Sequence, residues 1–88
     1  IETRKEVDKQ LIIYPKSSIL FNILGAVLSG QNKLQEALES YKKSIKINPN
    51  YAQAHNNLGV CMYRLGKMDE AINRYKQAIG LKNDFGKH

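Results

Sequence analysis

The sequence has few of the residues that cross-link very small proteins. It contains one cysteine, Cys61, in 88 residues, so an internal disulfide is excluded. Its histidines, His55 and His88, do not have the spacing to Cys61 that a zinc site requires. A lone cysteine suits a reducing compartment. We therefore expect a cytoplasmic protein without a metal or another cofactor.

Long hydrophobic runs are also missing. The longest uninterrupted apolar stretch is far shorter than the roughly 18 residues that a membrane span needs, so we expect no membrane association. Proline and glycine are sparse, with two and six residues, and 42% of the chain is apolar, which favours a folded helical protein over a disordered one. The chain begins at Ile1 without an initiator methionine, and we expect it to be a piece of a longer protein.

Negative charge is in the minority. Eight Asp and Glu residues against 14 Lys and Arg residues give a net charge of +6, which could indicate an acidic partner or nucleic acid. The basic residues are spread along the chain, however, and form no dense cluster interleaved with aromatic side chains for base stacking. We interpret them as a solvated basic surface and expect no nucleic-acid binding.

What the chain does have is an internal repeat of 34 residues. Residues 18–51 align with residues 52–85 at nine identical positions. These pairs are Asn22/Asn56, Leu24/Leu58, Gly25/Gly59, Lys33/Lys67, Glu36/Glu70, Ala37/Ala71, Tyr41/Tyr75, Lys42/Lys76 and Ile45/Ile79. The register continues backwards, because Pro15 matches Pro49. A fixed period of this length is typical of stacked-repeat proteins, which usually bind other molecules rather than transform them.

Apolar spacing and turn residues predict a series of short helices. Ser17 or Ser18 can cap the second helix, and capping-box spacing of Asn32 with Gln35 and of Asn50 with Gln53 predicts the starts of two others. The expected helices are Glu2–Ile12, Ser18–Ser29, one from Asn32 to about Ile47, one from Asn50 to Arg64 or Leu65, and Met68–Gly80. The connections are short, so neighbouring helices should run antiparallel.

Within each unit, small and large apolar residues keep a fixed spacing. The first reads Phe21-x2-Leu24-Gly25-x2-Leu28…Ala37-x3-Tyr41…Pro49, and the second reads His55-x2-Leu58-Gly59-x2-Met62…Ala71-x3-Tyr75, with Asn83 in the proline position. This pattern closely resembles the tetratricopeptide repeat over nearly the whole chain. The resemblance implies an all-α fold in which antiparallel helix-turn-helix units stack as a right-handed α-solenoid.

The register divides the chain into parts of one domain. Residues 1–17 correspond to the second helix of a preceding repeat, residues 18–51 and 52–85 to two complete repeats, and residues 86–88 to the start of a truncated one. Gly25 and Gly59 should let each first helix approach its second helix closely, with Ala37 and Ala71 facing them. The large Tyr41 and Tyr75 should fill the gap to the following unit.

The resemblance also implies a function, which is to hold an extended peptide or partner protein in a concave groove lined by the first helices. The groove face of each first helix lies opposite its packed stripe. From spacing, the candidate residues are Ile19, Asn22, Ile23, Ala26 and Ser29 in one repeat and Gln53, Asn56, Asn57, Val60, Tyr63 and Arg64 in the other.

The asparagines are the most informative of these candidates, because an amide side chain both donates and accepts and can hold a peptide backbone. The run His55-Asn56-Asn57-Leu58-Gly59 resembles repeats of an intracellular sugar transferase that acts on Ser and Thr, where a ladder of groove asparagines holds the substrate. In that register Asn57 is the ladder residue, and Ile23 stands in the matching place one repeat earlier.

The remaining chemical groups have structural interpretations. We expect Cys61 to be a small core residue, His55 to be a packing residue, and the lysines and arginines of the second helices to lie on a solvated convex side. No constellation of residues supports catalysis, so we expect a non-catalytic module. Two alternatives stay open: a structural scaffold that associates with itself through its open helix ends, or the targeting arm of a larger transferase-type enzyme.

Overall fold

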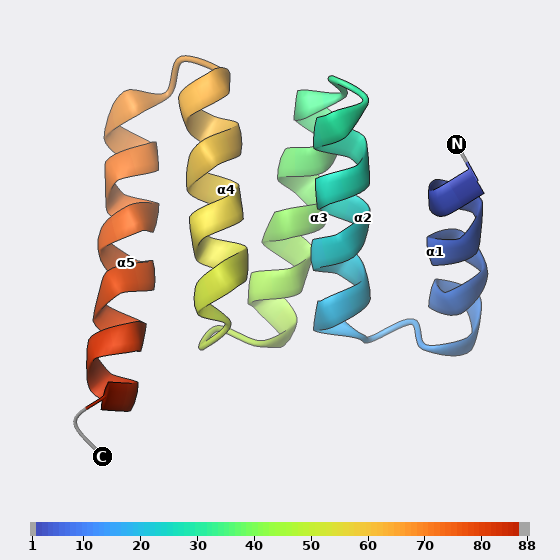
Figure 1. The fold of residues 1–88 in the computed structure, drawn as a ribbon, viewed down its shortest axis with the longest axis horizontal. Coiled ribbons are helices and arrows are strands. Elements are labelled where there is room, and N and C mark those ends of the chain that lie inside the picture. Colours follow the sequence, from blue (N-terminus) through green and yellow to red (C-terminus); the bar gives the residue numbers. More distant parts are fainter. Residues whose placement is uncertain (1, 87–88) are drawn as a thin grey trace.

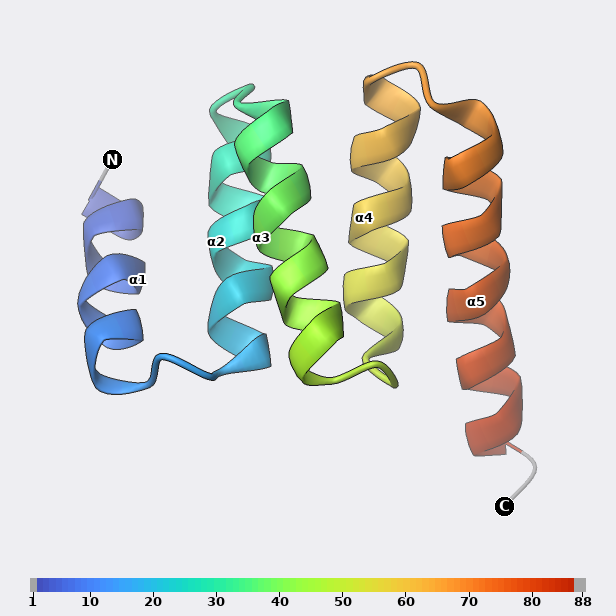
Figure 2. The same ribbon diagram turned by 180° about the vertical axis from the view of Figure 1, so that it is seen from behind.

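The computed structural model describes the backbone of residues 2–86 and the side chains of residues 4–81. This part of the chain contains helices and no strand: α1 (Glu2–Ile13), α2 (Ser18–Gly30), α3 (Leu34–Ile47), α4 (Ala52–Arg64) and α5 (Met68–Gly86). Successive helices run up and down, with α2 in front of α3 in Figure 1 and behind it in the reverse view of Figure 2. The predicted all-α fold of stacked antiparallel helix pairs is confirmed.

The turn inside each helix pair depends on one residue with left-handed backbone geometry. Asn32 and Gly66 lie 34 positions apart, and their φ angles are 62° and 84°. These residue types tolerate that geometry best. The next N–H, from Lys33, donates to the Leu28 carbonyl at 2.9 Å, and the same bond recurs one repeat later at 2.8 Å. The prediction that Asn32 caps α3 is therefore wrong, because its backbone forms the turn and α3 has no side-chain cap.

Of the other two predicted helix caps, one is confirmed and one is wrong. Ser17 caps α2 as predicted, because its hydroxyl accepts the Leu20 N–H at 3.2 Å. The predicted Asn50 cap is wrong, because α4 begins after Tyr51 and has no side-chain cap. The Asn50 N–H instead donates to the side-chain oxygen of Asn48 at 3.2 Å and so closes a local turn.

The last helix is longer than predicted. We expected it to end at Gly80, but α5 continues to Gly86. In the preceding repeat α3 ends before Pro49, which has no N–H and restricts the residue before it. Asn83 stands at the matching position and imposes neither constraint. Of the predicted truncated repeat at residues 86–88, residues 87 and 88 lie outside the described part of the chain.

The core lies where α3 contacts both α2 and α4. Its buried members are Leu28, Ala37, Leu38, Tyr41, Leu58, Cys61, Met62 and Ala71. Full burial of one large aliphatic side chain contributes about 1.5–3 kcal/mol, so residues such as Leu38, only 1% exposed, supply much of the stability. Both helix pairs contribute to this cluster, so the two repeats share one core.

A tyrosine ring lies on a glycine in each helix pair. A Cβ atom added at Gly25 would collide with the Tyr41 ring, and one added at Gly59 would lie 2.8 Å from Cε1 of Tyr75. The prediction that glycine permits a close approach is confirmed. Each tyrosine covers the glycine of its own pair, and Tyr41 also packs in the core with Leu58, Cys61 and Met62 of the following repeat, as predicted. At the second site the Ala71 carbonyl oxygen would also lie 3.3 Å from the added Cβ, so Ala71 faces Gly59 as predicted.

Substitution of Gly25 by alanine should destabilise the protein. The new methyl group would meet the buried Tyr41 ring, and overpacking of this kind costs about 1–3 kcal/mol. Gly80→Ala is the matched control, because nothing lies within 4 Å of its added Cβ and alanine should stabilise the middle of α5 by about 0.5–1 kcal/mol. Urea unfolding followed by circular dichroism measures both changes. A Gly25→Ala protein as stable as the unmodified chain would contradict the close contact.

Candidate functional site

The predicted groove residues lie on one face, formed by α2 and α4, which we call the α2–α4 face. Its exposed residues are Ile19, Ile23 and Ala26 from α2 and Gln53, Asn56, Val60, Tyr63 and Arg64 from α4. Asn22 is buried, with 7% of its surface exposed, and Ser29 and Asn57 are partly buried. The structure therefore leaves most of the candidates accessible but encloses Asn22.

A hydrogen-bonded chain joins the two helices near the middle of this face. Asn57 donates from Nδ2 to Oδ1 of Asn22 at 3.0 Å, and Asn22 donates from its own Nδ2 to the Tyr51 hydroxyl at 3.3 Å. The amide of Asn22 thus bridges two repeats. Its counterpart in the second repeat, Asn56, is exposed.

A second connection lies at the end of α2. Arg64 donates from Nη1 to the Ser29 hydroxyl at 2.8 Å and to the Ser29 carbonyl at 3.3 Å, and from Nη2 to Oδ1 of Asn32 at 3.2 Å. A cation is favourable here, because the last carbonyl groups of a helix lack partners within the helix. Arg64 and Ser29 are 35 residues apart, as are Asn57 and Asn22. Two bonds with the same repeat spacing therefore fix α4 against α2.

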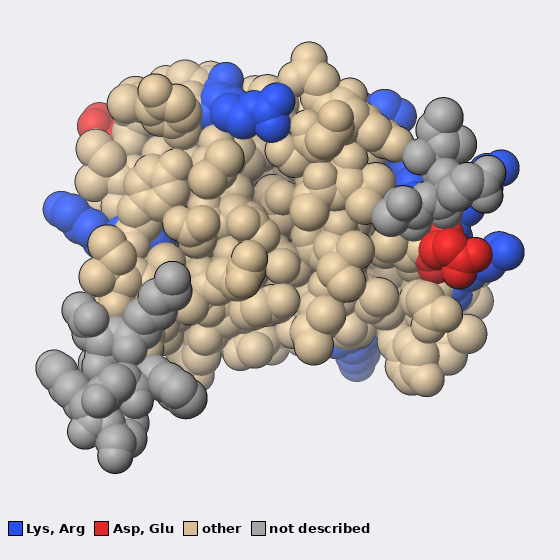
Figure 3. All heavy atoms as spheres, viewed as in Figure 1, with Lys and Arg blue, Asp and Glu red and all other residues tan. Residues whose placement is uncertain are grey.

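Between these connections the α2–α4 face is apolar and uncharged. Ile23 and Val60 are each 40% exposed, Tyr63 is 55% exposed, and Ala26 is exposed as well. Figure 3, drawn in the view of Figure 1, shows that charged side chains stand mainly at the margins of this side of the molecule. Such a surface suits the backbone and apolar side chains of a peptide better than a row of phosphates, whose binding is dominated by positive charge.

The interior cysteine does not behave as a reactive group. Cys61 is 1% exposed, and its Sγ donates to the Leu34 carbonyl at 3.2 Å. Burial raises the pKa of this thiol and so disfavours the nucleophilic thiolate. Burial also raises the pKa of Tyr41 to about 12, so its hydroxyl stays neutral. The prediction that Cys61 is a core residue is confirmed.

Both ring nitrogens of the buried histidine have a polar partner. His55 is 3% exposed, and its Nε2 lies 2.8 Å from the Pro49 carbonyl oxygen. A carbonyl only accepts, so Nε2 carries the proton and donates. Its Nδ1 lies 3.4 Å from Nη1 of Arg74, which can only donate. His55 therefore ties α4 to the preceding turn and to α5, which confirms its predicted packing role.

A cavity of about 340 Å³ lies away from the α2–α4 face, between α3, α4 and α5. Its lining residues are Lys42, Ile45, Leu58, Met62, Glu70, Asn73 and Arg74. Lys42 and Arg74 belong to the second-helix cations for which we expect a solvated surface, but both line this one cavity, which the sequence pattern does not predict. The sequence does contain one signal for this cavity: Lys42 and Arg74 are cations, whereas the matching positions one repeat earlier hold Asp8 and Ser40.

Among the described side chains, no three His, Cys, Asp or Glu residues are grouped so that they could hold a metal ion. None of the helices in the described part of the chain is both long and apolar enough to cross a membrane.

Comparison with known families agrees with the repeat geometry. The TPR repeat family matches residues 25–66, and the tetratricopeptide repeat family matches residues 52–85. Together the two matches span residues 25–85, which is well over half of the chain. The chain belongs to the tetratricopeptide repeat family. It is a protein-interaction scaffold module of a family that is generally non-catalytic.

Solved structures of MamA share the fold. A crystal structure of MamA superposes with a TM-score of 0.90 at 22% identity, covering 97% of this chain and 50% of that one. A second MamA crystal structure gives 0.85 at 27% identity, with 93% and 45% covered. The 41-end form of MamA from Desulfovibrio magneticus RS-1 gives 0.84 at 18% identity, with 89% and 44% covered. The chain thus spans about half the length of these proteins or slightly less. A comparison with curated proteins gives no significant match.

Asn22→Ala should destabilise the pairing of the two repeats. The substitution leaves the Asn57 amide and the Tyr51 hydroxyl without their partner in a part-buried site, which costs about 1–3 kcal/mol. Asn56→Ala removes the same side chain from the matching exposed position and should change the unfolding free energy by less than about 0.5 kcal/mol. Chemical denaturation of both variants makes the comparison. Equal effects at the two positions would show that the bridge contributes nothing.

Proposed function

We propose that this module binds an extended peptide segment of a partner protein across the α2–α4 face. The observation that carries the proposal is an accessible surface that is uncharged between Asn57 and Arg64 and whose two helices are joined at both of these residues. A surface that is already ordered loses little conformational entropy when a ligand binds, and more of the contact energy then remains as affinity.

Each part of the α2–α4 face has a role in this proposal. Ile23 and Val60 supply apolar area, and the exposed ring of Tyr63 is of the kind that often anchors an interface. Asn57 uses one N–H for Asn22, which leaves its second N–H and its carbonyl oxygen for a peptide backbone. Asn56 offers the same two functions one residue earlier.

The wider organisation is also a proposal. Helix α1 packs on α2 and corresponds in register to α3, so we assign it as the second helix of a preceding repeat. The two complete repeats are then residues 18–51 and 52–85. The same α2–α4 face would serve as the recognition surface if the module is the targeting arm of a larger transferase-type enzyme.

Charge placed on the α2–α4 face should abolish peptide binding. Ile23→Glu with Val60→Glu introduces two carboxylates at positions that are each 40% exposed, so the core is untouched. Ile47→Glu is the matched control, because Ile47 is 41% exposed on α3. Peptides are first selected from a random library on the unmodified chain and then labelled for fluorescence anisotropy. We expect at least about tenfold weaker binding to the double variant, or about 1.4 kcal/mol, and unchanged binding to the control.

Asn57 and Arg64 are less suitable positions for this test, because each also holds α4 against α2. Circular dichroism confirms that each variant keeps its helix content. If the selected peptides bind the double variant normally and lose affinity for Ile47→Glu, the α2–α4 face is not the binding surface.

The outer face of α5 favours a second candidate function, which is self-association. Ile72 and Ile79 are 45% and 58% exposed. Their counterparts one repeat earlier, Leu38 and Ile45, are buried and partly buried in a core to which α4 contributes. A helix-pair repeat normally buries this stripe against a neighbour. We propose that a second copy of the chain can cover it.

Light scattering over a concentration series tests self-association. We expect a mass above the 10.0 kDa of one chain that falls on dilution, and a stable monomer for Ile72→Glu with Ile79→Glu. The substitutions lie on the exposed stripe and should leave the helix content unchanged. An unmodified chain that is monomeric at every concentration would exclude this candidate.

A further inference from the structure

The cavity between α3 and α5 has an apolar floor. Leu58 and Met62 of α4 form its base and are 2% and 6% exposed, and the partly buried Ile45 adds apolar surface from α3. Its volume of about 340 Å³ lies at the lower end of the range of ligand pockets, roughly 300–1,000 Å³, and would admit one large side chain. This part of the cavity offers hydrophobic contact and no hydrogen bond from a side chain.

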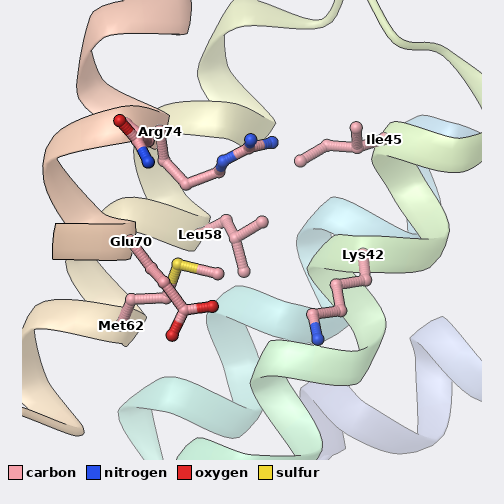
Figure 4. Close-up of a pocket in the computed structure, with 7 residues that line it drawn as sticks. Lys42, Ile45, Leu58, Met62, Glu70 and Arg74 are labelled. Carbon is pink, nitrogen blue, oxygen red and sulfur yellow. The ribbon is translucent and has the colours of Figure 1, made fainter. Parts of the chain in front are cut away.

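The walls of the same cavity carry charge. Figure 4 shows Arg74 extending from α5 toward Ile45 on α3, with Glu70 on the neighbouring turn of α5 and Lys42 on the opposite wall. Among the described side chains the ion pair present is Arg4–Asp8, so these three charged groups have no ion-pair partner there. Arg74 makes one long contact, 3.4 Å from Nη1 to the His55 ring. Most of its guanidinium donors remain for a ligand.

The repeat shows that the fold does not require these charges. One repeat earlier, the position of Lys42 holds Asp8 and the position of Arg74 holds Ser40. The floor residue, in contrast to the charged residues, is the same in both repeats, because the counterpart of Leu58 is also a leucine, Leu24. The apolar residue is thus kept in both repeats, whereas the two cations occur at only one of the two matching sets of positions.

We infer that this cavity is a second binding site, which takes an apolar side chain next to an acidic side chain of a partner peptide. The apolar group would contact Leu58 and Met62, and the carboxylate would lie between Lys42 and Arg74, where charge-assisted hydrogen bonds are strong. None of the seven lining residues is aromatic, so the cavity lacks the stacking surfaces that bind single-stranded nucleic acids. Glu70 and Asn73 can bond to the peptide backbone.

The test uses the isotope-labelled chain and a capped Gly-Leu-Glu-Glu-Gly peptide as the probe. Nuclear magnetic resonance titration should shift the signals of Ile45, Asn73 and their neighbours. A capped Gly-Leu-Gln-Gln-Gly peptide and a capped Gly-Ala-Glu-Glu-Gly peptide should each bind at least several-fold more weakly. Lys42→Glu should weaken binding of the first peptide about tenfold or more. Lys76→Glu, the same charge change at an exposed α5 position outside the cavity, should leave it unchanged.

Several results would overturn this inference. One is that no shifts concentrate at the cavity, and another is that the Gln peptide binds as well as the Glu peptide. Equal shifts with inorganic phosphate alone would indicate a general anion site, as a nucleic acid would use. Arg74→Gln provides a second variant and should also weaken binding. Ile23→Glu with Val60→Glu should have no effect here, so failure of this site and failure of the α2–α4 face are distinguishable.

Discussion

The contact of a tyrosine ring with a glycine sets the geometry of each helix pair. Helices α2, α3 and α4 have 13 or 14 residues, a length at which an isolated helix is marginal in water, so tertiary packing must hold them. Gly25 costs α2 about 1 kcal/mol of helix propensity relative to alanine. That cost is offset because the absent side chain lets Tyr41 bury its ring, which is 3% exposed, in the shared core.

The functional surfaces follow from this packing. Tyr41 and Leu38 place α3 in a core shared with α4, and the bonds from Asn57 and Arg64 then fix α4 against α2. Apart from Arg64, the face of the first helices is uncharged, and the second helices carry most of the cations, so the two proposed sites differ in chemistry. One suits a peptide backbone with small apolar groups, and the other suits an acidic side chain beside a large apolar one.

Local and periodic features could be predicted from the sequence, and features that depend on several helices could not. The 34-residue period, the glycines and the face of each first helix were readable because they recur at fixed spacing. Asn32 was misassigned because asparagine serves both helix caps and left-handed turns. Asn22 and Asn56 look alike in the sequence, yet Asn22 is buried and hydrogen-bonded to Tyr51 of its own repeat and to Asn57 of the following repeat, whereas Asn56 is exposed. The cavity could not be predicted, because it depends on how α3, α4 and α5 are placed relative to one another.

The most direct test of this account is a nuclear Overhauser measurement on the chain in solution. If the rings lie on the glycines, ring protons of Tyr41 should show strong cross-peaks to the α-protons of Gly25, and those of Tyr75 to Gly59. The glycine α-protons should also be displaced upfield by the ring currents. Absence of both sets of cross-peaks would contradict the packing on which the repeat geometry and the two proposed surfaces depend.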